Sequence, residues 1–131
     1  MKTNAGNDFQ ALVMGGAGNG TGTSAPAKYM CLSATAGENA THTALAGEIV
    51  TGGGGLIRQS ATYAHTTGAN TYTLTGTFTA NGSDSLPVTI AQIGILNAAS
   101  TGTLVFEKQL GTTATISASG DILTVTETVT M

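Results

Sequence analysis

The feature that most constrains the fold is a strict two-residue alternation between residues 71 and 79. Apolar or small residues, Tyr72, Leu74, Gly76 and Phe78, alternate there with five threonines. Successive side chains of a β-strand point to opposite faces of the sheet, so this segment predicts a strand with one apolar and one hydroxyl face. We expect the apolar face to pack in a core and the threonines to lie in solvent.

Further strand patterns follow at intervals of roughly ten residues, separated by turn residues rather than by helical segments. They cover residues 86–96, 104–110, 113–118 and 122–130. In the first of them Val88 and Ile90 share one parity and Ile93 and Ile95 the other, which predicts a bulge near 92–94 or burial on both faces. The chain is therefore expected to be all-β, as an antiparallel β-sandwich, a jelly-roll-like fold or a small barrel.

The N-terminal part is less regular. Apolar runs at 10–14 and 29–33 alternate with glycine-rich stretches at 15–24 and 52–55. We expect one domain overall, in which residues 56–131 form the sandwich core and residues 1–55 an irregular region with an arm and early strands. The run 10–14 is either part of an arm that orders on a partner or a strand of the core sheet.

The best helical candidate of the chain is the segment from Ala36 to Ala46. Glu38 and His42 stand there at the i, i+4 spacing that stabilises a helix, although threonines weaken the pattern. The sequence therefore allows one short helix in an otherwise β-rich chain.

Side chains that carry catalytic or metal chemistry are few and scattered. His42 and His65 lack a His, Cys or carboxylate at ligand spacing, so both are expected in loops or on the surface. Cys31 lies in an apolar run and predicts a buried thiol. Glu48 and Asp84 stand in loops without the spacing of a calcium loop or a glycosidase pair. We therefore predict no catalytic, cofactor-binding or metal-binding residue, no cofactor and no enzyme activity.

Three further features have structural interpretations. The glycines at 15, 16, 18 and 20 resemble a phosphate-binding loop but lack its Gly-Lys-Ser/Thr ending. Arg58 is expected either at a solvated strand edge or in a salt bridge to a neighbouring subunit. The turn at Ser119, Gly120 and Asp121 predicts a carboxylate that accepts free backbone N–H groups.

Charge limits the possible partners. Only 8% of the residues are charged and the net charge is −3, with four basic residues, Lys2, Lys28, Arg58 and Lys108, spread along the chain. Direct nucleic-acid binding is therefore not expected. No apolar run has the length of a signal peptide or a membrane span, so we expect synthesis in a cytoplasm and no membrane partner. A surface of threonine and serine repels its own copies weakly, which predicts a homo-oligomer, with a trimer or another ring favoured.

An ordered series of strand and turn motifs runs from Gly47 to Met131. It comprises Gly47 and Glu48, residues 55–58, Ala61, Thr62, Tyr63 and His65, and residues 77–80, 93–98, 102–104 and 119–125. This order resembles a family of small virion proteins of tailed bacteriophages, which act as capsid decoration (cement) proteins or as parts of the neck and tail.

The resemblance implies a non-enzymatic virion protein, made in the host cytoplasm. It would stabilise junctions between capsid subunits, with the major capsid protein or other virion proteins as partners. A neck, tail or fibre component is one alternative, and a carbohydrate-binding or adhesin sandwich is an alternative of another class. Clustered exposed aromatic residues would favour the latter.

Overall fold

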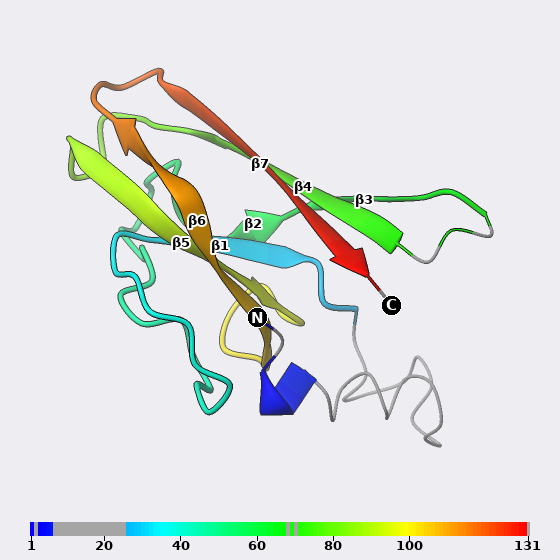
Figure 1. Ribbon diagram of the computed structural model, residues 1–131. Helices are drawn as coiled ribbons and strands as arrows, with labels where there is room; N and C mark the ends of the chain where they lie inside the picture. The colour runs from blue at the N-terminus through cyan, green and yellow to red at the C-terminus, as the bar shows by residue number, and fades with distance from the viewer. Residues whose placement is uncertain (2, 7–25, 68, 70, 131) are drawn as a thin grey trace.

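The computed structural model describes residues 1, 3–6, 26–67, 69 and 71–130. Its regular secondary structure is almost entirely β-strand (Figure 1). The strands are β1 (Tyr29–Ser33), β2 (Gln59–Ser60), β3 (Thr62–His65), β4 (Thr71–Thr79), β5 (Val88–Leu96), β6 (Leu104–Ile116) and β7 (Ile122–Thr130). Within the described residues, no helix is long and apolar enough to cross a membrane.

The strands form two antiparallel sheets that pack face to face. One sheet has the order β2-β1-β5-β6 and the other the order β3-β4-β7. Residues from both sheets share one hydrophobic core, and the described strands do not close into a barrel. The expected all-β fold is confirmed, in the form of a β-sandwich.

The alternation in β4 determines which side of the three-stranded sheet faces the core. Leu74 and Phe78 are buried, whereas Thr77 and Thr79 between and beside them are exposed. The inner face of β4 is tightly packed at Gly76, because a Cβ atom there would be 2.7 Å from the Met30 Sδ atom of the other sheet and 2.9 Å from the Phe78 ring. The predicted apolar and hydroxyl faces of this strand are confirmed.

β5 is buried on both of its faces. Ile90, Ile93 and Ile95 all pack in the core between the sheets, because the register of β5 against β6 shifts between Ile90 and Gln92. The other face contacts a second apolar cluster of Cys31, Leu45, Leu96 and Leu104. Both explanations of the parity change therefore apply, and the irregularity lies slightly before the predicted position.

Two predicted elements differ from the structure. Residues 104–110 and 113–118 were expected as separate strands, but β6 is a single strand from Leu104 to Ile116. Its pairing with β5 shifts opposite Ala91, where β6 has more residues than β5. The predicted helix from Ala36 to Ala46 is wrong, since this segment consists of turns and irregular backbone. Its threonines disfavour a helix, and Glu38 and His42 bond to other segments instead of forming a pair.

The sandwich also includes residues before 56. β1 lies between β2 and β5 in the four-stranded sheet. At the edge of β6, the Thr3 N–H donates to the Val105 carbonyl, and the Glu107 N–H donates to the Met1 carbonyl. Residue 55 is therefore not a boundary of the sheets. The predicted arm and strand at 10–24 lie outside the described residues.

The register of β4 leads to a stability prediction. Phe78→Ala should lower the free energy of unfolding by about 3–5 kcal/mol, because it removes a fully buried ring and leaves a cavity. Thr77→Ala, one residue away on the exposed face, should change it by less than about 0.5 kcal/mol. Urea unfolding of both variants measures this, and equal losses would contradict the register.

Candidate functional site

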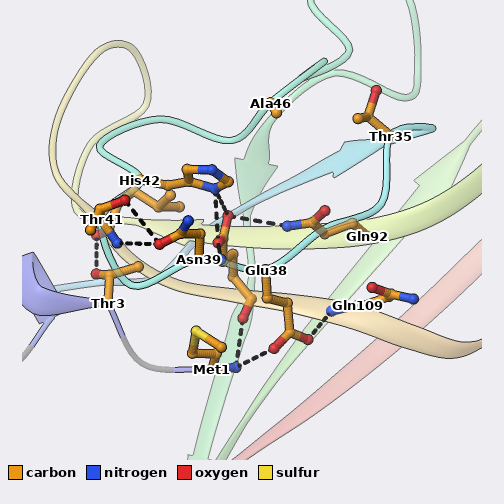
Figure 2. A network of polar contacts seen from close by, with 12 residues as sticks. Met1, Thr3, Thr35, Glu38, Asn39, Thr41, His42, Ala46, Gln92 and Gln109 are labelled. Carbon is orange, nitrogen blue, oxygen red and sulfur yellow. Dashed lines mark hydrogen bonds and ion pairs between the residues drawn. The ribbon is translucent and has the colours of Figure 1, made fainter.

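A cluster of polar side chains lies on the outer face of the four-stranded sheet, beneath the segment that connects β1 and β2 (Figure 2). We call Glu38, Asn39, His42, Gln92 and Glu107 the polar cluster. Phe106 of β6 packs against the core, so its neighbour Glu107 points to the opposite face. The connecting segment covers that face, and Glu107 is 0% exposed as a result.

Both carboxylate oxygens of Glu107 have partners. His42 Nδ1 lies 3.0 Å from Oε1 and 3.1 Å from Oε2, and Gln92 Nε2 donates to Oε2 at 3.1 Å. The backbone N–H of Asn39 donates to Oε1. A buried carboxylate costs several kcal/mol of desolvation unless such partners compensate it. The connecting segment supplies two of the three partners, so Glu107 fastens this segment to the sheet.

Glu38 makes a second attachment at the rim of the polar cluster. Its carboxylate accepts a hydrogen bond from the Gln109 N–H and lies 3.3 Å from the N-terminal ammonium of Met1. Partial burial raises the pKa of Glu38, but the Gln109 hydrogen bond and the ammonium charge outweigh this and hold it below its ordinary value. The polar cluster therefore joins the connecting segment, β6 and the start of the chain.

Arg58 forms an ion pair within the chain. Its Nε and Nη2 atoms donate to the two carboxylate oxygens of Glu48 at 2.9 and 2.7 Å, and Nη1 donates to the carbonyls of Ala98 and Thr101. The hydrogen bond to Glu48 raises the pKa of Arg58. Arg58 was expected at a solvated edge or in a bridge to a neighbouring subunit. In the structure it instead joins Glu48 to the turn after β5.

Asp84 stabilises backbone rather than a ligand. Its carboxylate accepts hydrogen bonds from the N–H groups of Gly55, Leu56 and Asn81. Burial raises the pKa of Asp84, but these three hydrogen bonds lower it below its ordinary value. Asp84 and Glu48 both line a groove of about 330 Å³ whose other walls include Ile49 and Val88, and each carboxylate has a structural partner there.

Three other candidates agree with their expected roles. Asp121 accepts hydrogen bonds from the N–H groups of Ser117 and Ala118, both at 3.0 Å, as the turn predicted. Cys31 is fully buried, and burial raises its pKa to about 12. His65 lies exposed on β3 with Nδ1 2.9 Å from the Thr71 carbonyl oxygen.

His42 lies in a loop, as expected, but the sequence did not predict its buried partner. The contact spans 65 positions of the chain, so no local spacing could indicate it. The available signal was Glu107 itself, a lone carboxylate directly after Leu104, Val105 and Phe106. Among the described residues, no group of three or more His, Cys, Asp and Glu is placed to hold a metal ion.

The outer face of the three-stranded sheet is a regular polar surface. Four pairs of threonines oppose each other across β4 and β7, at Thr71 and Thr130, Thr73 and Thr128, Thr75 and Thr126, and Thr77 and Thr124. We call these eight residues the threonine face. The Oγ1 atoms of Thr75 and Thr126 lie 3.2 Å apart, and every outward position of β4 and β7 is uncharged.

No protein-family model matches the chain, and no curated protein matches it. The candidate sites are therefore classified by their geometry alone, as internal attachments or as surfaces open to a partner. The polar cluster and the Arg58–Glu48 pair are internal attachments, whereas the threonine face is open to a partner.

Removal of the Glu107 carboxylate should destabilise the fold strongly. Glu107→Ala leaves His42, the Gln92 amide and the Asn39 N–H without their acceptor, so we expect a loss of about 3–5 kcal/mol in the free energy of unfolding. Lys108→Ala, at the exposed neighbouring position, is the control. Urea unfolding checks the difference, and a Glu107→Ala loss as small as that of the control would contradict the role of the polar cluster.

Asp84 leads to a prediction on pH. Its folded-state pKa is depressed, so its contribution to stability is present above the pKa of the unfolded chain and is lost as pH falls through the folded pKa. The free energy of unfolding should therefore fall on acidification below about pH 4. In Asp84→Ala this fall should be smaller and stability at neutral pH lower. Parallel curves for the two proteins would contradict the assignment.

Proposed function

We propose that this protein is a non-enzymatic structural protein of a bacteriophage virion. Its most specific form is a capsid decoration protein that stabilises junctions between capsid subunits. The observation that carries the proposal is the threonine face, a broad uncharged surface on a sheet whose other side is fixed in the core. The order of strand and turn motifs from Gly47 to Met131 supports the same class of protein.

The chemistry of the threonine face suits a permanent protein contact. Charged residues are depleted at the centres of protein interfaces, because each charge must be desolvated or paired there. Threonine offers one hydroxyl donor and acceptor beside a methyl group, and its branched Cβ leaves few side-chain rotamers to be lost on binding. Cross-strand contacts such as that between Thr75 and Thr126 order these hydroxyls before a partner arrives.

The internal attachments support a role that requires a rigid body. The polar cluster binds the long connection between β1 and β2 to the four-stranded sheet. Arg58, paired with Glu48 of the same connection, binds it to the turn between β5 and β6. The partner on the particle would be the major capsid protein or another virion protein. A neck, tail or fibre component would use the same surface at another place on the particle.

A binding experiment with matched variants tests the threonine face. Thr75→Lys and Thr77→Lys together place two charges on this face, whereas Thr89→Lys and Thr115→Lys alter an equivalent exposed threonine pair on the other sheet. Cosedimentation with purified capsids of the phage that encodes the chain should fall at least tenfold for the first pair only. Equal binding by both double variants would contradict the use of this face.

One observation favours the second candidate function, carbohydrate binding. Tyr63 is 59% exposed, and its ring centroid lies 5.5 Å from that of Tyr72 and 6.5 Å from that of His65. In Figure 1 the β3–β4 hairpin that carries these rings extends beyond the four-stranded sheet. Exposed aromatic faces offer apolar area with a polar edge, which suits the C–H faces of sugar rings.

A glycan array followed by calorimetric titration distinguishes the two functions. Saccharide binding that Tyr63→Ala abolishes, in a protein that does not sediment with capsids, would support the carbohydrate function and overturn the structural one. Capsid binding that is unchanged in Tyr63→Ala, without saccharide binding, is the outcome that the proposal predicts.

A further inference from the structure

The last strand, β7, is an open edge of the three-stranded sheet. All nine of its residues pair with β4 on one side, and no described segment forms a backbone hydrogen bond with its other side outside that pairing. In an antiparallel sheet the peptide groups of alternate residues point to each side of a strand. Every second residue of β7 therefore directs an N–H and a C=O group away from the sheet.

β7 has only one of the usual protections of an edge strand, a charged residue on its inner side. It contains no proline, lysine or arginine, and its single charge, Glu127, is partly buried on the inner side. The other edges are shorter or partly covered: β2 has two residues, β3 has four, and the first part of β6 is paired with Met1 and Thr3. A long edge with a single charge is a template for pairing with another strand.

The side-chain order of β7 is nearly symmetric about Thr126. Counted outwards from Thr126, Val125 corresponds to Glu127, Thr124 to Thr128, and Leu123 to Val129. When a second copy runs antiparallel through this centre, Thr126 opposes Thr126, Thr124 opposes Thr128 and Leu123 opposes Val129. The two unlike pairs are Val125 with Glu127 and Ile122 with Thr130. Such a contact uses the same patch on both protomers and closes on itself.

We propose that β7 pairs antiparallel with β7 of a second copy about a twofold axis at Thr126. This contact joins the two three-stranded sheets into one continuous sheet and satisfies both open edges. It also places the two threonine faces on the same side, so the dimer presents twice the uncharged surface of the monomer. The contact itself does not depend on the proposed function.

Other antiparallel registers are less favourable. A shift of the axis to Glu127 would place two carboxylates directly opposite each other, which destabilises a sheet. A shift of pairing by one residue would oppose the threonines of one copy to the inward residues of the other. Pairing centred on Thr126 aligns all nine residues and keeps the two Glu127 side chains out of direct opposition.

A twofold contact gives dimers, which differ from the trimer expected from composition. Mass measurement by light scattering on the purified full chain, without capsids, should therefore give a dimer at high concentration and a monomer on dilution. A monomer throughout, or a trimer without a dimer, would overturn the proposal.

Two lysine variants test the position of the contact. Thr126→Lys brings two like charges together at the axis and should weaken dimerisation at least tenfold. Thr75→Lys is the matched control, because Thr75 lies beside Thr126 on the same face but one strand further from the edge. The control should remain dimeric even where it loses capsid binding, so the two proposals can fail independently. A Thr126→Lys dimer as tight as the unmodified one would overturn the assignment.

Spin-label distances test the register. Labels on Thr126→Cys should lie close together across the axis, whereas labels on Ile122→Cys should be about 27 Å apart, eight residues along the strands. The native thiol of Cys31 is buried and should not take the label. A shorter distance at position 122 than at position 126 would overturn the twofold register.

Discussion

The close packing of the two sheets at Gly76 is the constraint on which the rest of the structure depends. Met30 from one sheet and Phe78 from the other occupy the space that a side chain at this position would need. Because the inner face of β4 is committed to this contact, the threonines between its apolar residues must face outwards. The exposed threonine face is thus a direct consequence of the core.

The four-stranded sheet must be covered on both sides, because it carries apolar residues on both of its faces. Its inner side packs against β4 and β7, and its outer side is covered by irregular chain rather than by a third sheet. Irregular backbone packs stably only when its polar groups are satisfied. Glu107 and Arg58 meet this need from within the chain, which explains why these two charged residues form internal bonds.

The parts of the structure that depend on local periodicity were predictable from the sequence. The faces of β4 and β7, the turn at Asp121 and the burial of Cys31 all follow from residues close together in the chain. The contacts of His42, Arg58 and Asp84 depend on which segments the topology brings together, and no spacing shows this. The helix expected near Glu38 failed for the same reason, since tertiary partners replaced the i, i+4 pair.

The central claim is that an uncharged sheet face serves assembly rather than chemistry. For the proposed virion role, electron cryomicroscopy of intact particles of the proposed phage tests it most directly. The account predicts density for the β-sandwich at junctions between capsid subunits, with the β4–β7 face against the shell. Particles that lack the chain, or that hold it with this face towards solvent, would contradict the account.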